Sequence, residues 1–467
     1  MQRALVYGLA VAGEATVAAL QRHGYDVTAV DDVVDEAKFA IAERLGVHLV
    51  IGSTFDPASV PEYDVVAPAP GIPESHPVIV ASTAAGVPVR TELELAYRWE
   101  HERAAATGSP RRPILAITGT DGKTTTTELT VAILRAAGHR AVDVGNTDTP
   151  MVTAVDWDGD AAVDVFVVEA TSFRLAFTEQ FHADAAVWLN LAPDHLNWHT
   201  GLDSYIAAKA RLFTLQHPAD VAIGFARDPI VMQHLATAPA RQRTFGTDAA
   251  DYHVGVHDGA TWLIGPGGPI APVAAMRRAL PHDLTNALAA AALVLEAGLA
   301  SEAHIAEALG TFRAPPHRLE PLGEARDVRW FNDSKATTPH AAATAIQAFD
   351  SLVLIAGGSR KGVDLAPMGQ WPERMRGVVA IGQAGPDVAA VFTSAGVPVV
   401  TADDMSEAIH RASELARPGD AVVLSPGCAS FDWYTSYVAR GDDFRSKVTA
   451  HLAAASTQPA HSAQEES

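Results

Sequence analysis

Short apolar runs alternate with longer stretches of helical periodicity along most of this chain. Near the N-terminus, apolar residues 4–7 and 25–30 predict two strands, and residues 13–23 between them predict a helix. Such alternation is typical of a parallel sheet with helices on its faces. The same alternation follows residue 327, where apolar runs at 352–356, 378–381 and 421–424 end in polar or glycine-rich turns. The pattern therefore predicts an α/β protein with Rossmann-like, mostly parallel sheets.

The strongest local pattern is a buried strand that enters a tight glycine turn. Apolar residues 114–117 precede T-G-T-D-G-K-T at 118–124, and a helix is predicted at 128–134. A helix N-terminus leaves N–H groups free to bind phosphate oxygens. Lys123 can reach the β- and γ-phosphates, and the Thr124 hydroxyl can ligate Mg²⁺. Ile117 stands where the usual P-loop has its first glycine, so an ordinary strand-turn-helix with a solvated lysine is the alternative.

Polar residues close two further strands downstream of this turn. Glu169 ends the apolar run 163–168, where P-loop proteins hold Mg²⁺, although an acid there is also common at a helix N-terminus. His195 and His199 follow the predicted strand 185–189. They could belong to a Zn²⁺ site, and His195 could hold a second Mg²⁺ or orient a phosphate. Lys209, on a predicted helix at 204–213, is a surface lysine when taken alone.

The first strand and the second strand both end in candidate ligand residues. Gly8 and Gly13 flank the turn after the first strand, and Asp31 and Asp32 end the second. In dinucleotide-binding folds such a turn lies near a diphosphate and the acid lies near a ribose or base. Ala10 stands where that fingerprint has a glycine. Close packing of strand on helix therefore explains the glycines as well as ligand binding does.

Turn-forming stretches divide the chain. Residues 106–113 are small or rich in proline and glycine, and the Pro315-Pro316 pair cannot continue a helix. We expect three domains, at residues 1–106, 107–313 and 314–455, followed by a polar, disordered tail at 456–467.

Composition narrows the classes of function. The 467 residues carry a formal net charge of −21, which argues against general nucleic-acid binding. No apolar run is long enough to span a bilayer, and the N-terminus has no signal-peptide pattern, so no membrane insertion is expected. The single cysteine, Cys428, can form no internal disulfide and is expected to be a packed thiol. These features predict a cytoplasmic protein.

Several separated motifs, taken in order, resemble the Mur ligase family across essentially the whole chain. Two of them, F-N-D-S-K-A-T at 331–337 and L-S-P-G-C-A-S-F-D at 424–432, resemble the family member that adds D-glutamate. The others are T-G-T-D-G-K-T-T at 118–125, E-A-T-S-F-R-L at 169–175, D-H-L-N at 194–197, Y-I-A-A-K-A-R at 205–211, H-D-L-T-N-A-L-A-A-A at 282–291, P-P-H-R-L-E at 315–320, G-G-S-R-K-G at 357–362 and R-G-D-D-F at 440–444.

The resemblance implies a fold and a reaction. The expected domains are a Rossmann-like domain for the UDP moiety, a central P-loop ATPase domain and a C-terminal Rossmann-like domain for the amino acid. The expected reaction adds D-glutamate to UDP-N-acetylmuramoyl-L-alanine in peptidoglycan precursor synthesis, through an acyl phosphate and a tetrahedral intermediate. ATP and Mg²⁺ at two sites are implied, with Lys209 carbamylated. Both substrates are small molecules, and we expect a monomer.

The resemblance also assigns residues to sites. Those implied in catalysis are Lys123, His195, Lys209 and Lys361. ATP would be bound by Gly119, Thr120, Asp121, Gly122, Lys123, Thr124, Thr125, Asn286, Arg318 and Asp333. The UDP-substrate would meet Gly8, Gly13, Asp31, Asp32, Asn146 and His195. D-Glutamate would meet Thr337, Lys361, Ser430, Phe431 and Tyr437, and Mg²⁺ would meet Thr124, Glu169, His195 and carbamylated Lys209.

Departures and alternatives remain at this point. Asp283 stands where the family usually has asparagine, Ala69 where a hydroxyl residue is common, and Asp32 where threonine is common. Helix capping is the simpler role for Asp283. A related ligase that adds a different amino acid, a folylpolyglutamate synthetase and a non-catalytic nucleotide-binding scaffold are the alternative functions.

Overall fold

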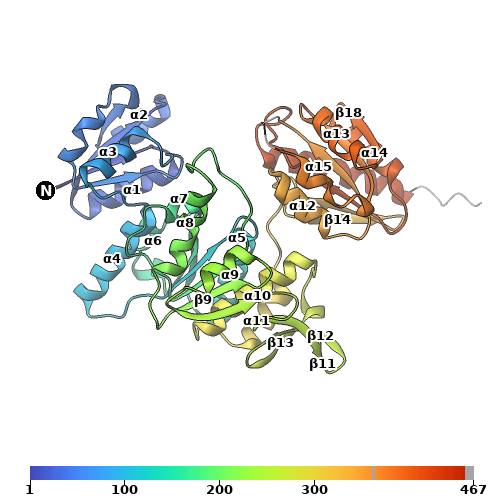
Figure 1. Cartoon of the computed structure of the whole chain (residues 1–467), viewed down its shortest axis with the longest axis horizontal. Helices are drawn as coiled ribbons and strands as arrows, with labels where there is room; N and C mark the ends of the chain where they lie inside the picture. The colour runs from blue at the N-terminus through green and yellow to red at the C-terminus, as the bar shows by residue number, and fades with distance from the viewer. Residues whose placement is uncertain (360–361, 363, 458–467) are drawn as a thin grey trace, which may run out of the picture. The chain divides into compact units, whose positions relative to one another are not determined.

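The structure, a computed structural model, describes residues 1–359, 362 and 364–457, with only the backbone of residues 160, 456 and 457. Its contacts divide the chain into two compact units, Met1–Phe312 and Arg313–Ser467 (Figure 1). The predicted boundary at 313/314 lies beside this division. The predicted boundary at 106/107 falls inside the first unit, at the end of a helix. The division into three domains stays a prediction, and residues 458–467 of the predicted tail lie outside the described residues.

The first unit begins with a four-stranded sheet in the order β3-β2-β1-β4, with every neighbouring pair parallel. Residues 4–7 of β1 are almost fully buried because their apolar side chains lie between helices on both faces. The strands and helices of this region are β1 (Gln2–Tyr7), α1 (Val11–Arg22), β2 (Tyr25–Asp31), α2 (Glu36–Leu45), β3 (His48–Ile51), β4 (Val65–Pro68), α3 (Pro77–Ala85) and α4 (Glu92–Thr107).

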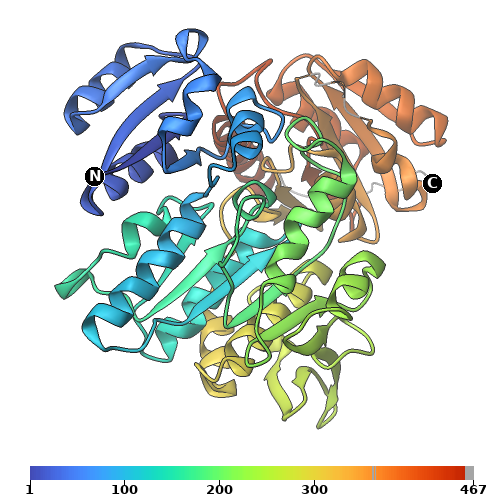
Figure 2. The same ribbon diagram turned by 60° about the vertical axis from the view of Figure 1, so that its left-hand side comes forward.

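A six-stranded parallel sheet follows, in the order β10-β9-β8-β5-β7-β6. Strand β5 lies inside the sheet between β8 and β7, and all five of its residues are buried. Figure 2 shows the strands of this sheet side by side. Its elements are β5 (Ile114–Thr118), α5 (Lys123–Ala136), β6 (Ala141–Gly145), α6 (Met151–Ala154), β7 (Val165–Glu169), α7 (Ser172–Leu175), β8 (Ala185–Trp188), α8 (Leu202–Thr214), β9 (Val221–Phe225), α9 (Pro229–Leu235) and β10 (Arg241–Phe245).

A small antiparallel sheet and two helices complete the first unit. The sheet has the order β11-β12-β13, and α10 and α11 both pack against α5. The alanine run in α10 is fully buried, which lets this helix approach the central sheet closely. The elements are β11 (His253–His257), β12 (Ala260–Gly265), β13 (Gly268–Pro272), α10 (Pro281–Glu296) and α11 (Glu302–Thr311).

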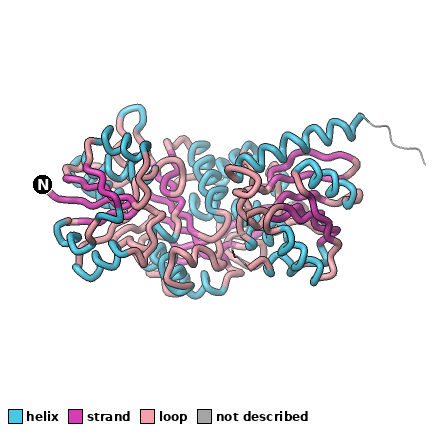
Figure 3. The backbone as a smooth tube through the Cα atoms, turned by 90° about the horizontal axis from the view of Figure 1, so that it is seen from above, coloured by secondary structure: helices cyan, strands magenta, loops and turns pink. Residues whose placement is uncertain are grey.

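The second unit is built on a sheet in the order β14-β15-β19-β16-β17-β18, with β14 antiparallel and the other pairs parallel. Figure 3 shows its strands with helices around them. The elements are β14 (Glu320–Ala325), β15 (Val328–Asn332), α12 (Pro339–Gln347), β16 (Leu352–Gly357), β17 (Met375–Ile381), α13 (Gly385–Ser394), β18 (Val399–Ala402), α14 (Met405–Leu415), β19 (Ala421–Leu424) and α15 (Tyr437–Thr457).

The predicted α/β class with mostly parallel sheets is confirmed. The strands predicted from apolar runs are present, and most of their ends agree within two residues. The antiparallel hairpins were not predicted in detail, because their strands contain glycines and most of their residues are at least partly exposed. Among the described residues, no helix has the length and apolar character needed to cross a bilayer.

Candidate active site

The glycine turn after β5 has the backbone shape that the sequence predicts for it. Gly119 has φ +155° and Gly122 has φ +84°, conformations that favour glycine. A Cβ at Gly119 would lie 2.9 Å from the Leu189 Cβ, so a larger residue would collide with the end of the neighbouring strand. Helix α5 begins at Lys123, directly after Gly122. The turn therefore aims the N-terminus of α5 at the carboxyl edge of the sheet.

Asn190, which the sequence analysis did not single out, braces this turn. Its side-chain oxygen accepts from the N–H groups of Thr120 at 3.0 Å and Asp121 at 2.9 Å. Its Nδ2 donates to the Asp121 carbonyl at 3.2 Å. The Thr120 hydroxyl lies 3.0 Å from the Tyr205 hydroxyl of α8. The position of Asn190 in the sequence could have indicated this role, because Asn190 comes just after β8, and β8 pairs with β5.

Two lysines meet at one carbonyl of the turn. Lys123 Nζ donates to the Gly119 carbonyl at 2.9 Å, and Lys209 Nζ donates to the same oxygen at 2.8 Å. Lys209 is buried, so the surface role it would have when taken alone is wrong. Burial, followed by the nearby charge of Lys123, lowers the pKa of Lys209 well below its usual value. A lowered pKa makes the neutral amine of Lys209 accessible.

Glu169 ends β7 and lies almost completely buried. Its Oε1 accepts from Asn146 Nδ2 at 2.8 Å. Its Oε2 is buried and has no hydrogen-bond partner among the described residues. A buried carboxylate oxygen is costly unless it is paired or ligates a cation. Glu169 therefore fits the predicted metal role.

His195 lies in the loop after β8 with φ +55°. Its Nε2 is 3.3 Å from Asp194 Oδ2, and its ring packs 4.6 Å from the Phe173 ring, centroid to centroid. Burial lowers the pKa of His195, Asp194 opposes the shift, and the charges of Lys123 and Lys209 add to it. The imidazole therefore lies within electrostatic range of both lysines and favours its neutral, metal-binding form.

The contacts of His199 indicate a structural role rather than metal binding. It is buried, and its Nε2 lies 2.9 Å from the Ser172 hydroxyl. Its Nδ1 lies 3.6 Å from Glu74, which also accepts hydrogen bonds from Thr200 and Ser204. In the described part of the chain, no group of three or more histidines, cysteines and acids could hold a metal. The alternative of a Zn²⁺ site gains no support.

Asn286 of α10 reaches the turn from the other side. A Cβ at Gly122 would lie 2.7 Å from Asn286 Oδ1, so the glycine allows this amide to approach. Asp283, one turn earlier, accepts from Leu280 N–H at 3.1 Å and from Arg278 at 2.6 Å. The capping role expected for Asp283 is confirmed. Thr124 and Thr125 lie in the first turn of α5, with Thr125 buried.

The predicted UDP-binding residues near the N-terminus make packing contacts and hydrogen bonds within the protein. A Cβ at Gly13 would lie 1.8 Å from the Gly8 carbonyl, so these glycines are needed for close packing of strand on helix. Asp31 accepts from Leu9 N–H at 2.6 Å and from Lys38 Nζ at 2.6 Å. Burial of Asp31 raises its pKa, but these hydrogen bonds outweigh burial and lower it overall.

Asp32 is more open, with its side chain 53% exposed. Its Oδ1 accepts from the Tyr7 hydroxyl at 2.5 Å, and its Oδ2 lies 3.5 Å from His76 Nε2. Contact of the UDP-substrate with Gly8, Gly13, Asp31 and Asp32 stays a prediction.

In the second unit, Arg440 joins two of the predicted binding loops. The guanidinium is 1% exposed and donates to the Ser334 hydroxyl at 2.9 Å and to the Ser334 carbonyl at 2.9 Å. It also donates to the carbonyls of Cys428 at 3.2 Å and Ala429 at 3.3 Å. Burial lowers the pKa of Arg440 to about 10. Sequence reasoning gave Arg440 no role beyond its motif.

The other predicted residues of this unit lie around the same loops. Asp333 accepts from Ser425 Oγ at 2.7 Å and from Leu319 N–H at 3.1 Å, next to Arg318. Lys335 Nζ lies 5.4 Å from the centre of the Tyr437 ring.

Of the predicted D-glutamate residues, Thr337 bonds its N–H to the Lys335 carbonyl at 2.8 Å, Ser430 is buried and Phe431 is 67% exposed. Lys361 lies outside the described residues. Cys428 is buried, as expected of a packed thiol. Their contacts with ATP or D-glutamate stay predictions.

The first unit thus brings an acid, two lysines and a histidine to the turn that opens α5. A helix N-terminus and the side chain of Lys123 suit the phosphates of a nucleoside triphosphate, and the Glu169 oxygen that has no partner among the described residues suits its Mg²⁺. This combination on a parallel sheet defines the class as P-loop nucleotide-binding α/β proteins.

Comparison with known proteins narrows this class to one family. Residues 117–294 match the family model described as the Mur ligase middle domain, and residues 317–428 match that of the Mur ligase glutamate ligase domain. The UDP-N-acetylmuramoylalanine–D-glutamate ligase of Frankia casuarinae is 38% identical over 96% of this chain and 93% of its own. That of Thermobifida fusca is 36% identical over 96% and 98%. The chain belongs to the Mur ligase family.

Solved structures of the family share the fold. The MurF ligase of Thermotoga maritima, in complex with ADP, aligns with TM-score 0.57 and 13% identity over 97% of this chain and 98% of its own. The UDP-N-acetylmuramate–alanine ligase of the same organism aligns with TM-score 0.56 and 17% identity over 97% and 100%. At these identities the likeness concerns the fold.

Proposed function

We propose that this chain is an ATP-dependent ligase that joins D-glutamate to the alanine carboxylate of UDP-N-acetylmuramoyl-L-alanine. The observation that carries the proposal is the identity of 34% to 38%, over nearly the whole chain, with relatives that bear this activity in their names. Lys123, the buried Lys209 and the buried Glu169 at the glycine turn support the ATP-dependent half of the reaction. The step belongs to peptidoglycan precursor synthesis, which uses cytoplasmic nucleotides.

The chemistry follows from the weakness of a carboxylate as an electrophile. The alanine carboxylate attacks the γ-phosphorus of ATP, and ADP leaves with the electrons of the broken bond. The amine of D-glutamate then attacks the acyl phosphate, and phosphate leaves from the tetrahedral intermediate after the amine loses a proton. Both partners in the first step are anions, so cationic groups must offset their repulsion.

Residues of the first unit are suited to that task. Lys123 and the N-terminus of α5 would hold the γ-phosphate, and Asn286 would contact the nucleotide from α10. Thr124, Glu169 and His195 would hold Mg²⁺. When bound, Mg²⁺ neutralises phosphate charge. Arg318 and Asp333 are also proposed to contact the nucleotide. The D-glutamate site would be formed by Thr337, Lys361, Ser430, Phe431 and Tyr437.

Lys209 has a special place in the proposal, because a cationic lysine cannot ligate a cation. Its neutral amine would add to CO₂ and lose one proton, which yields an anionic carbamate whose oxygens can bind the second Mg²⁺. Burial of Lys209 and the nearby charge of Lys123 favour the neutral amine that this step needs. Asn146 and His195 would contact the sugar-linked substrate, and the chain is proposed to act as a monomer.

The test is phosphate release from ATP with Mg²⁺, UDP-N-acetylmuramoyl-L-alanine and one amino acid at a time. Release with D-glutamate alone, together with a new amide product, is the expected result. Release with a different amino acid would keep the mechanism and refute the substrate. No release with any amino acid would refute the ligase activity.

A further inference from the structure

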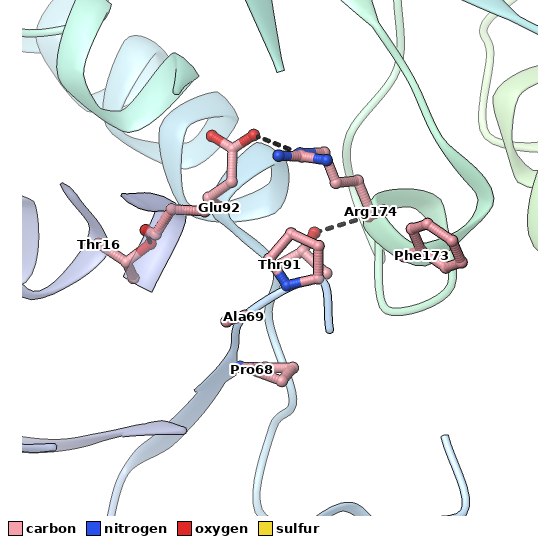
Figure 4. Close-up of a pocket in the computed structure, with 9 residues that line it drawn as sticks. Thr16, Pro68, Ala69, Thr91, Glu92, Phe173 and Arg174 are labelled. Atoms are coloured by element: carbon pink, nitrogen blue, oxygen red, sulfur yellow. Dashed lines mark hydrogen bonds and ion pairs between the residues drawn. The ribbon is translucent and has the colours of Figure 1, made fainter. Parts of the chain in front are cut away.

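A pocket in the first unit is lined in part by Phe173 and Arg174, which follow the predicted metal ligand Glu169 in the same sequence motif. Strand β4 ends at its rim, and helices α1, α4 and α7 supply other walls (Figure 4). Residues from these elements that line it include Thr16, Ala69, Thr91, Glu92, Phe173 and Arg174. Arg174 is a cationic side chain in this lining, and the sequence analysis gave it no role.

Arg174 is held rigidly at both ends. Its Nε donates to Glu92 Oε1 at 3.1 Å, and its carbonyl accepts from the Thr91 hydroxyl at 2.7 Å (Figure 4). Glu92 Oε2 in turn accepts from Val152 N–H at 3.3 Å. Arg174 is 6% exposed and Glu92 is 4% exposed, so both charges are almost fully removed from water. Thr91 therefore fixes the backbone of Arg174, and Glu92 holds its guanidinium.

From this position Arg174 reaches the metal carboxylate through one amide. Its Nη1 donates to Asn146 Oδ1 at 2.9 Å, and Asn146 Nδ2 donates to Glu169 Oε1 at 2.8 Å. A guanidinium can only donate and a carboxylate can only accept, so the amide can satisfy both in one orientation alone. Arg174 thus dictates which face of Asn146 meets Glu169.

This series of hydrogen bonds ends at the carboxylate of Glu169, where it determines which oxygen is engaged. Oε1 of Glu169 is held by Asn146, while its buried Oε2 has no partner among the described residues. We propose that Arg174 is a positioning residue that acts through Asn146 to hold Glu169 with Oε2 turned to the magnesium of ATP. This inference rests on the proposed role of Glu169 as a metal ligand.

The simpler explanation is that Arg174 and Glu92 are only a buried ion pair that ties α7 to α4. The chain offers a matched pair for comparison. Arg112 donates to Glu100 of α4 at 2.9 Å, and Glu100 is fully buried. None of the hydrogen bonds of Arg112 reaches a predicted metal ligand. Arg112→Met therefore removes a buried ion pair without the loss of positioning, while Arg103 still pairs with Glu100.

The experiment measures binding of Mn²⁺, a paramagnetic stand-in for Mg²⁺, to the full chain saturated with ADP. The signal of free Mn²⁺ in electron paramagnetic resonance gives the Kd without any turnover. We expect Arg174→Met to weaken Mn²⁺ binding about tenfold, as is usual for partners of metal ligands. Arg112→Met should leave the Kd unchanged. In an Asn146→Ala background, Arg174→Met should add no further loss, because the two act in series.

A double variant separates positioning from stability. Arg174→Met leaves Glu92 as a lone buried charge, which destabilises the fold, and Glu92→Gln removes that charge. Glu92→Gln combined with Arg174→Met should recover the melting temperature while Mn²⁺ binding stays weak.

Three results would overturn the inference. They are parental Mn²⁺ affinity in folded Arg174→Met, recovery of affinity together with stability in the double variant, and equal losses in the Arg112→Met control. Unchanged affinity in Glu169→Gln would instead refute the metal role of Glu169, which belongs to the proposed function.

Discussion

Two lysine amines converge on one carbonyl, that of Gly119, at the start of the central helix α5. Two like charges at such a site repel, and burial adds to the cost, so one of them is driven toward its neutral form. Lys209 is the more buried of the two, and its pKa is lowered by burial and by Lys123. At the scale of single residues, this crowding separates their roles. In the proposed mechanism Lys123 contacts the transferred phosphate, and Lys209 is the candidate for carbamylation.

Lys209→Ala should therefore reduce ligase activity by about 100-fold or more, the size of loss seen when a charge-stabilising group is removed from an active site. Acetate or formate should restore part of the activity, because a carboxylate can replace the oxygens of the lost carbamate. Lys447→Ala, which removes an amine on α15 that pairs with Asp443, is the control and should behave like the parent. Undiminished activity in Lys209→Ala, or a loss that no small carboxylate relieves, would refute the carbamate.

Some of these residues could be predicted from the sequence, and others could not. Glu169 and Lys123 stand directly beside an apolar run and a glycine turn, so local pattern was enough to single them out. Lys209 and Asn286 lie on alanine-rich helices, where their approach to the turn depends on tertiary packing. Sequence analysis gave Asn190 and Arg174 no role because each acts by hydrogen bonding to another residue. A pattern of apolar and polar positions does not reveal such contacts.

At the scale of elements, the predicted ligand residues lie where parallel strands end. The turn after β5, Glu169 after β7 and the loop after β8 share one edge of the central sheet. In the second unit, the loops after β15 and β19 also lie at one edge of their sheet, since these two strands pair in parallel. Parallel strands deliver their carboxyl ends to one edge, so residues distant in sequence meet there. Helix α15 then contributes Arg440, which joins the two loops of the second unit.

Arg440→Met should raise the KM for D-glutamate about tenfold or more, since hydrogen bonds to a charged group are worth roughly 1.5–3 kcal/mol each and several would be lost. Arg445→Met is the matched control, because Arg445 lies on the same helix but pairs with Glu320. Steady-state kinetics on variants first shown to be folded by circular dichroism provide the measurement. If both variants change the KM equally, the link between the two loops does not shape the D-glutamate site.

The alternation of apolar strands and helices was sufficient to predict the elements around both sheets, because buried parallel strands leave a strong apolar signature. It was insufficient for the hairpins. Strands β11 to β13 are half exposed and rich in glycine, and β14 (Glu320–Ala325) mixes acids with proline and glycine. Such strands are held by pairing with neighbours, which local pattern does not reveal.

At the scale of the whole molecule, the chain combines two compact units with separate tasks. The first unit carries the glycine turn, both lysines and Glu169, and the second carries the loops proposed to bind D-glutamate. In the proposed reaction an acyl phosphate forms at the glycine turn, and the amine of D-glutamate attacks it. The proposal therefore assigns residues of both units to one reaction.

The most direct measurement follows the oxygen atoms of the reaction. The enzyme would be given ATP, Mg²⁺, D-glutamate and UDP-N-acetylmuramoyl-L-alanine whose alanine carboxylate is labelled with the heavy isotope of oxygen. If the carboxylate attacks the γ-phosphorus, the phosphate released must carry the label while the amide product forms in equal amount. Mass spectrometry of the phosphate would detect it. Unlabelled phosphate would mean that ATP was cleaved by water, and would contradict the account.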